Sequence, residues 1–275
     1  MTFDLYYNKS MNILSRVAFT IFGVDVYYYG LIMSLSILAC LIVAFLLAKP
    51  KKIETSEPFE IFLSIVPAGI LCARLFSVIF EDGLTLADYF NFRTGGMSII
   101  GAIIGGALGA LIYKLIKKKS FLHIADIITS VLLLGQSLGR WGNYFNNEVY
   151  GMEITNPSLQ FFPFGVQIGG TWYEALFFYE SVLSLIGFIV ILIVYLKTKK
   201  SGWATGIYLT YYGTVRLILE GRRQAAYILK WGSVPVSSLV SGIFIVIGVA
   251  ILVYLTIKTV KQKKELKSGR EEIHS

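Results

Sequence analysis

Long apolar runs separated by short polar segments fill the chain from about residue 28 to residue 257. A run of roughly 18 or more residues with almost no charge is long enough to cross a hydrocarbon core about 30 Å thick. Because backbone groups in hydrocarbon must satisfy their own hydrogen bonds, each run should be a helix. The pattern therefore predicts an all-α, polytopic membrane protein with about seven transmembrane helices. The expected spans are 28–47, 59–80, 97–116, 124–138, 174–196, 204–219 and 236–257.

The segments between and after these spans complete the predicted organisation. The span at 124–138 is the shortest, and it is either tilted or continues through the Gly-Arg pair that follows it. A segment at about 140–173 contains several glycines and prolines, which favour turns over a long helix. We expect one transmembrane domain over residues 1–257, including this loop. The polar, basic residues 258–275 should form a disordered cytoplasmic tail.

Composition and charge placement agree with this organisation and add an orientation. Of the 275 residues, 55% are apolar and only 15% are charged, whereas soluble domains carry about 25% charged residues. If seven spans alternate, 16 lysines and arginines lie on one side of the membrane and 7 on the other. The positive-inside rule then places the N-terminus outside and the C-terminus in the cytoplasm. The net charge of +8 therefore indicates topology, and no nucleic-acid partner is expected.

Small residues inside the spans suggest packing contacts. Gly101, Gly105 and Gly109 form two overlapping Gly-x-x-x-Gly patterns, which let a neighbouring helix approach one face closely. Cys40 and Cys72 lie inside apolar runs without a Cys-x-x-Cys pattern or a nearby histidine, so they should serve as small packing residues. We expect no bound metal and no cofactor.

Charged residues inside the spans are the first functional candidates. Each costs roughly 2.5–3.5 kcal/mol at a helix centre on insertion scales, so such residues are retained for pairing or function. Tyr212, Arg216 and Glu220 recur every four residues and share one helical face. They form either a structural ion pair that docks the helix, or an arginine held by Glu220 to bind a phosphate. The other charges inside spans are Arg74, Asp126 and Glu180.

The densest polar stretch lies at 139–151, at the predicted outer end of a span. It holds an arginine, three asparagines and a glutamate within nine residues, Arg140, Asn143, Asn146, Asn147 and Glu148. Asparagine side chains can donate and accept hydrogen bonds in a half-dry cavity, and the surrounding glycines permit tight turns. A purely structural loop needs no such density, so this stretch is the leading candidate for a binding or catalytic site.

The same stretch resembles the signature of the bacterial prolipoprotein diacylglyceryl transferase family, which reads like Gly-Arg-x-Gly-Asn-Phe-x-Asn-x-Glu-x-x-Gly. Here those places are filled by Arg140, Gly142, Asn143, Asn146, Glu148 and Gly151, with Tyr144 where phenylalanine is usual. Other segments look like further family motifs in the same order along the chain. They are Tyr29-Gly30, Gly95-Gly96-Met97-Ser98, Phe178-Tyr179-Glu180-Ser181 and the run from Tyr212 to Arg223.

The resemblance implies a multi-pass enzyme of the bacterial cytoplasmic (inner) membrane with its active site toward the extracytoplasmic side. Such an enzyme transfers the diacylglyceryl group of phosphatidylglycerol to the lipobox cysteine of a signal-peptide-bearing preprolipoprotein. A thioether forms and glycerol phosphate leaves, which is the first step of lipoprotein maturation. The bilayer and these two substrates are the implied partners.

The resemblance also suggests roles for individual residues. Arg140 and Arg216 would hold the phosphate, because guanidinium groups suit two oxygens. Asn143 and Asn146 would orient headgroup hydroxyls, and Tyr29 and Tyr212 would donate hydrogen bonds or relay the thiol proton. Glu148 is the preferred base, because Glu220 should be occupied with Arg216. Gly151 and Glu220 complete the expected substrate-binding set.

The chain departs from the family pattern at three places. Ile100 stands where the family carries a histidine after Gly-Gly-Met-Ser-x, Glu174-Ala175 where it carries His-Pro, and Pro235–Ser238 where it carries Arg-x-Ser-Gln. The only histidines, His123 and His274, fall on the predicted cytoplasmic side. Either another group is the base, or the chain is a divergent member with reduced activity or another acceptor. A non-enzymatic lipid carrier is the competing class.

Overall fold

Seven α-helices form the body of the protein. The computed structural model describes residues 16–80, 83–91, 96–224, 228, 230–231 and 234–273. Six of the helices are long and apolar enough to cross a membrane, which confirms the predicted class of all-α polytopic membrane protein. The helices are α1 (Tyr28–Ala48), α2 (Ser56–Phe80), α3 (Ile99–Lys117), α4 (Phe121–Asn146), α5 (Leu176–Lys197), α6 (Trp203–Glu220) and α7 (Val236–Ile273).

Short elements precede α1 and occupy connections between the later helices. In the described part of the chain, antiparallel hairpins pair β1 with β2, β3 with β4, and β5 with β6. The strands are β1 (Val17–Ile21), β2 (Val24–Tyr27), β3 (Gly165–Ile168), β4 (Thr171–Glu174), β5 (Lys230–Trp231) and β6 (Val234–Pro235). Described 3-10 turns lie at Leu86–Asp88 and Pro157–Leu159.

Two helix ends differ from the sequence-based prediction. α4 continues to Asn146, past residue 138 and past the Gly-Arg pair to which the alternative prediction extended it, so residues 140–146 of the predicted loop are helical. α7 continues to Ile273, so the prediction of a disordered tail after residue 257 was wrong. In both cases hydropathy marks where contact with lipid should end, whereas the helix continues into a polar segment. The segment that extends α7 is rich in lysine, glutamate and glutamine, which are good helix formers.

The chain divides into two compact units, and the described part of the first comprises residues 41–127. Within it, α2 and α3 pack backbone against backbone. A Cβ atom added at Gly101, Gly105 or Gly109 would lie 2.3–2.4 Å from a carbonyl oxygen of α2. The predicted small-residue face of α3 is therefore the α2–α3 contact. We call these three glycines and the α2 backbone they touch the glycine seam.

Charged side chains of the first unit make structural contacts. Arg74 is fully buried, and its guanidinium donates hydrogen bonds to the carbonyls of Gly96, Asp88 and Asn91. The buried Glu57 pairs with Lys119 at 3.1 Å and with the Nε2 of His123 at 3.0 Å. His123 is thus part of an ion-pair group at the start of α2.

The described part of the second unit comprises residues 16–40 and 128–273. Within it, α1 packs along α4 in an antiparallel sense through glycines of α4. A Cβ at Gly135 would meet the sulfur of Cys40, and a Cβ at Gly142 would lie 2.9 Å from the ring of Tyr29. The close approach places the Tyr29 ring directly against the polar end of α4.

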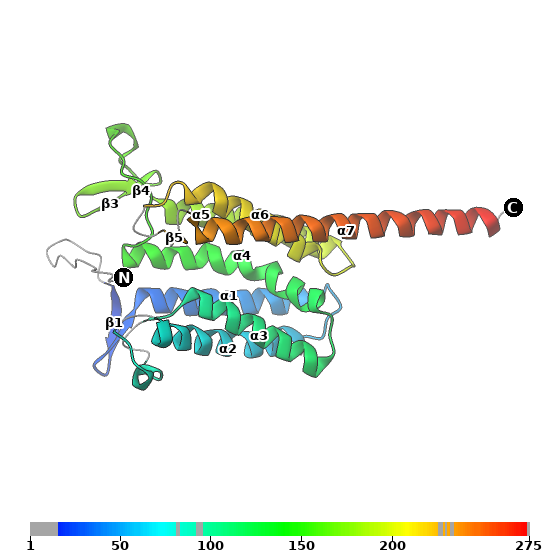
Figure 1. Cartoon of the computed structure of the whole chain (residues 1–275), viewed down its shortest axis with the longest axis horizontal. Helices are drawn as coiled ribbons and strands as arrows, with labels where there is room; N and C mark the ends of the chain where they lie inside the picture. The colour runs from blue at the N-terminus through cyan, green and yellow to red at the C-terminus, as the bar shows by residue number, and fades with distance from the viewer. Residues whose placement is uncertain are drawn as a thin grey trace. The chain divides into compact units, whose positions relative to one another are not determined.

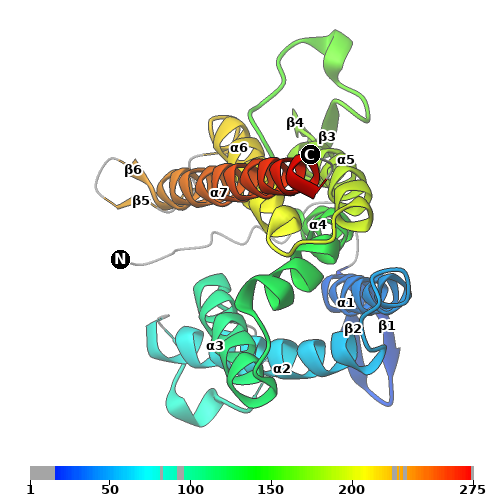
Figure 2. The same ribbon diagram turned by 90° about the vertical axis from the view of Figure 1, so that its right-hand side faces the viewer.

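The remaining helices of the second unit, α5, α6 and α7, lie alongside α4 (Figures 1 and 2). Ser137 of α4 and Ser181 of α5 exchange hydrogen bonds with each other's carbonyl oxygens. α6 packs on α7 through small residues, because a Cβ at Gly213 would lie 2.7 Å from the Ser241 carbonyl oxygen. α6 is not among the six helices apolar enough to span a membrane, since Arg216 and Glu220 interrupt its apolar pattern.

Candidate functional site

The end of α4 folds the polar motif back on itself. The N–H of Asn147 donates to the Tyr144 carbonyl at 3.0 Å, and the N–H of Glu148 donates to the Asn143 carbonyl at 3.1 Å. These two bonds, with Asn147 in the left-handed conformation (φ 51°), form a Schellman C-cap. Val149 also has a positive φ of 58°, a strained conformation for a β-branched residue. The cap turns the chain so that Glu148 lies over the last turn of the helix.

This turn brings three predicted site residues together. The Oε1 atom of Glu148 accepts hydrogen bonds from the side-chain amides of Asn143 at 2.9 Å and Asn146 at 3.4 Å. A guanidinium N–H of Arg16 donates to the Asn146 carbonyl at 3.2 Å and ties the segment before β1 to this end of α4. We call Asn143, Asn146 and Glu148 the amide–carboxylate cluster.

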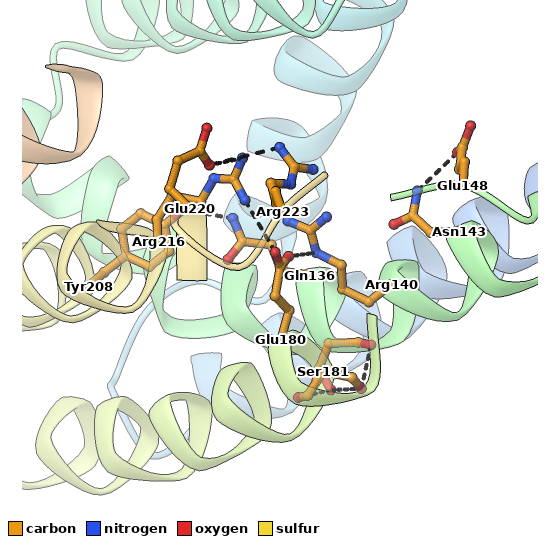
Figure 3. Close-up of polar contacts among 11 residues, drawn as sticks. Gln136, Arg140, Asn143, Glu148, Glu180, Ser181, Tyr208, Arg216, Glu220 and Arg223 are labelled. Atoms are coloured by element: carbon orange, nitrogen blue, oxygen red, sulfur yellow. Dashed lines mark hydrogen bonds and ion pairs between the residues drawn. The ribbon is translucent and has the colours of Figure 1, made fainter. Parts of the chain in front are cut away.

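A second group of side chains lies between α4, α5 and α6, and we call it the arginine cluster (Figure 3). Glu180 of α5 is at its centre, with its Oε2 atom 2.5 Å from Arg140 and its Oε1 atom 3.1 Å from Arg216. Arg216 also pairs with Glu220 at 3.0 Å, one helical turn away. Arg223 lies 4.0 Å from Glu220, so the cluster comprises three guanidinium groups and two carboxylates.

Burial makes the charges of this cluster strong. The side chains of Glu180 and Glu220 are each 6% exposed, and those of Arg216 and Arg223 are 12% and 11% exposed. Burial, and next the neighbouring Arg216 charge, lowers the pKa of Arg223 to about 10, so this group stays positive at neutral pH. The cluster therefore carries one more positive than negative charge in a poorly hydrated place. Such a site favours one bound anion.

The other predicted residues lie around these clusters. Tyr212 stacks on Tyr208 with ring centroids 5.7 Å apart. Its ring lines a small void of about 10 Å³ together with Arg140, Glu180 and Arg216. The predicted Arg216–Glu220 pair is present, and Ser237 at the start of α7 donates a hydrogen bond to Glu220.

Gly151 packs beside the arginine cluster. Its N–H donates to the Glu174 carbonyl at 3.0 Å, and it forms an isolated bridge with Arg223. An added Cβ would lie 2.7 Å from the Cβ of Glu174 and 3.2 Å from the Arg222 carbonyl oxygen. Glycine at this position lets the chain after α4 pass close to Arg223. This close packing is what the structure shows for Gly151, and its predicted part in substrate binding stays a prediction.

A larger cavity of about 530 Å³ opens beside the amide–carboxylate cluster. Its lining includes Asn143 and Glu148, all four residues of β3, and a wall of aromatic rings. The rings belong to Trp141, Tyr144, Tyr150, Phe162, Trp172 and Phe177. No lysine or arginine is among the described residues that line it. The two sites therefore differ in charge, one cationic and nearly filled, the other roomy with a single carboxylate.

Sequence reasoning missed the central position of Glu180 and the contribution of Arg223. Glu180 was noted only as an intramembrane charge and as part of a family-like motif, and Arg223 only as the end of another. Two signals could have found them: a carboxylate inside an apolar span needs a cation, and the chain has few cations inside its spans. Within the described residues, no three His, Cys, Asp or Glu side chains are grouped as metal ligands.

The fold and this pair of sites define a class, a multi-pass α-helical membrane protein with a buried arginine–carboxylate cluster beside an aromatic cavity. A family model described as prolipoprotein diacylglyceryl transferase matches residues 16–254. The chain belongs to this prolipoprotein diacylglyceryl transferase family.

Individual relatives are similar over nearly their whole length. The phosphatidylglycerol–prolipoprotein diacylglyceryl transferase of Clostridioides difficile is 34% identical over 249 residues, covering 89% of this chain and 97% of that protein. The enzyme of the same name from Clostridium botulinum is 35% identical over 262 residues, with 91% and 99% coverage. The Listeria innocua enzyme is 33% identical, with 89% and 91% coverage.

Proposed function

We propose that this chain transfers the diacylglyceryl group of phosphatidylglycerol to the lipobox cysteine of a preprolipoprotein. The proposal follows from membership of the transferase family, and the arginine cluster is the observation that carries it at the level of residues. A phosphodiester bears one negative charge, and the cluster has one positive charge in excess. A bound phosphatidylglycerol phosphate would neutralise it.

The reaction needs no covalent enzyme intermediate. The thiol sulfur attacks the glyceryl carbon bonded to the phosphate oxygen, a C–S bond forms, and the C–O bond breaks. The electron pair of that bond leaves with the glycerol phosphate, and the thiol proton passes to a base. Negative charge grows on the departing phosphate, so fixed guanidinium groups stabilise the transition state more than the ground state.

The geometry supports a division of labour between the two clusters. Arg140 and Arg216 would hold the phosphate, since both are fixed by Glu180 before substrate arrives. Glu148 is our proposed base, because its Oε1 atom is held by two amides and its carboxylate faces the cavity. Asn143 stands about one turn of α4 from Arg140, about 4.5 Å along the helix axis. We propose that a thiol beside Glu148 meets the phosphate-bonded carbon at this end of α4.

The absence of the family's histidine fits this division. Ile100 on α3 occupies that position and has no exchangeable proton. His123 is paired with Glu57 in the first unit. A carboxylate base, with Tyr29 and Tyr212 as hydrogen-bond donors, would replace the imidazole.

We further propose that the protein resides in the bacterial cytoplasmic membrane with both clusters toward the extracytoplasmic side. The distribution of lysine and arginine between the two sides supports this orientation. Phosphatidylglycerol could then enter from the outer leaflet, where signal-peptide-bearing substrates expose the lipobox.

The deciding experiment is phosphatidylglycerol-dependent transfer to a lipobox peptide by purified protein, comparing wild type with Arg140→Ala. We expect thioether product from wild type and a kcat/KM about 10²–10³-fold lower in the variant, as for loss of one electrostatic donor. Arg222→Ala is the matched control, because Arg222 is 61% exposed and pairs only with Glu174 in the described interactions.

The possible outcomes separate the alternatives. Product formation that depends on Arg140 but not on Arg222 supports the transferase assignment despite Ile100. A folded wild-type protein that binds phosphatidylglycerol without product would instead indicate a lipid carrier. Diacylglyceryl transfer to other thiols but not to the lipobox peptide would indicate a different acceptor.

A further inference from the structure

We propose that the 530 Å³ cavity binds the acceptor polypeptide as an extended strand along β3, while the lipid phosphate binds separately in the arginine cluster. This inference rests on the proposed function and assigns its two substrates to two places. The charge of the cavity, its shape, and the strand edge at one wall support this assignment.

Charge separates the two substrates. The cavity has one charged group among its lining residues, the carboxylate of Glu148, and no cation. A lipid phosphate would be repelled by that carboxylate, whereas an uncharged peptide segment would not. The arginine cluster offers the reverse, an excess of positive charge around a void of only about 10 Å³. Charge therefore assigns the anion to the cluster and an uncharged peptide to the cavity.

The size and lining of the cavity also suit a short peptide. Cavities of about 300–1,000 Å³ with mainly apolar walls and a few polar groups are typical of specific binding sites. Here the apolar wall consists of aromatic rings such as Trp141, Trp172 and Phe177. The polar lining comprises Asn143, Asn147 and Glu148 from the end of α4 and the turn after it, and Gln167 from β3. A cysteine could enter from the end formed by α4. A cysteine side chain directed to that end would meet the proposed base.

The β3 strand provides a backbone template. β3 pairs with β4 from Gly165 opposite Glu174 to Ile168 opposite Thr171. Trp172 and Glu174 turn their backbone groups away from β3, where they bond the segment at 151–154. In an antiparallel pair, two opposite residues either bond each other through their N–H and C=O groups or both turn these groups to the outer edges of their own strands. Gln167, opposite Trp172, therefore turns its N–H and C=O to the outer edge of β3.

On that outer edge the N–H of Gly165 donates to the Phe161 carbonyl at 2.9 Å, whereas the outward N–H and C=O of Gln167 have no strand partner among the described residues, where β3 and β4 form a sheet of two strands. An exposed strand edge beside a cavity is the arrangement by which extended peptides add to a sheet. Main-chain bonds give affinity that tolerates different side chains, which suits an enzyme that must accept many polypeptides.

The first test exchanges Gln167 for proline, which removes the outward N–H while proline remains tolerated on a sheet edge. We expect the KM for a lipobox peptide to rise at least about tenfold, with the KM for phosphatidylglycerol unchanged. Gln167→Ala keeps the N–H and should raise the peptide KM much less than the proline variant. A rise in the phosphatidylglycerol KM, or equal effects of alanine and proline, would overturn the assignment.

The second test leaves the protein unchanged and so does not depend on the variant's folding. Peptides in which single amides near the cysteine are replaced by esters each lose one N–H donor. Pairing with β3 uses every second residue, so the peptide KM should rise at alternate positions only. An effect that is uniform or absent along the peptide would contradict strand addition. A wild-type protein that makes no thioether at all would instead refute the proposed function.

Discussion

In the glycine seam the backbones of α2 and α3 meet directly, whereas α4, α5 and α6 meet through charged side chains. The seam leaves no space for one additional carbon, since a Cβ at Gly105 would lie 2.3 Å from the Ala68 carbonyl oxygen. The arginine cluster encloses a void of about 10 Å³ next to Arg140 and Arg216. The α2–α3 interface is filled by backbone atoms, whereas the interface of α4, α5 and α6 contains buried charged side chains.

This difference indicates what each interface contributes. Close helix packing in membranes gains van der Waals contact and is a means of stability. Buried ion pairs are weak evidence for stability, because removing charges from water offsets much of their attraction. The arginine cluster is therefore best explained by the anion it can bind. Substitutions in the seam should affect folding, and substitutions in the cluster should affect chemistry.

The largest expected effect is a loss of stability caused by a substitution in the glycine seam. Gly105→Leu should lower the free energy of unfolding by more than the ~1–3 kcal/mol usual for overpacking, because the obstructing atom is backbone and cannot move away. Unfolding in detergent, followed by circular dichroism, measures it.

Gly106→Ala is the matched control on the neighbouring position. Its Cβ would lie 3.5 Å from the Ile65 side chain, an ordinary contact, and alanine favours a helix by up to about 1 kcal/mol over glycine. We therefore expect unchanged or slightly higher stability. Equal destabilisation by both substitutions would show that the seam is not set by close backbone contact.

The next effect concerns the arginine cluster. Arg216→Ala should reduce kcat/KM about 10²–10³-fold. Arg216→Lys keeps the charge but loses the planar fork that bonds Glu180 and Glu220 together, so it should recover only part of the activity. Full activity of the lysine variant would show that charge alone suffices.

The smallest effect should follow Glu180→Gln, because Glu180 is a positioning residue that acts through two arginines. The amide keeps the shape but releases Arg140 and Arg216 from their ion pairs, and misplacement by about 1 Å can reduce a rate about 10²-fold. The cluster would gain one positive charge, so the KM for phosphatidylglycerol should not rise while kcat falls. A raised KM with unchanged kcat would contradict the positioning role.

The helices could largely be predicted from the sequence, and the two failures share a cause. Apolar runs gave seven helices in the observed order, yet the ends of α4 and α7 were placed too early. An apolar run marks only the part of a helix that can contact lipid. The helix itself continues into water wherever its residues favour helix formation. The spacing of Arg140, Asn143 and Asn146 at three residues was a helical signal within the predicted loop.

The candidate site was predictable in its members but not in its connections. The dense motif indicated Arg140, Asn143, Asn146 and Glu148, all of which the structure places around one end of α4. The partner of Arg140 is 40 residues away on α5, and no spacing rule relates the two helices. Such a contact arises from helix packing, which is decided by glycines and serines elsewhere in the chain.

The length of α7 has a practical consequence. Its 38 residues span about 57 Å, while the hydrocarbon core is about 30 Å thick. Ser237 touches Glu220 at one end, and the charged residues from Lys258 onward extend the rod about 24 Å past the apolar part. A fluorescent or affinity tag fused after α7 would thus stand at the far end of this helix from Glu220. In the proposed orientation the tag lies on the cytoplasmic side, away from both proposed substrate sites, and offers a handle for immobilising or imaging the protein.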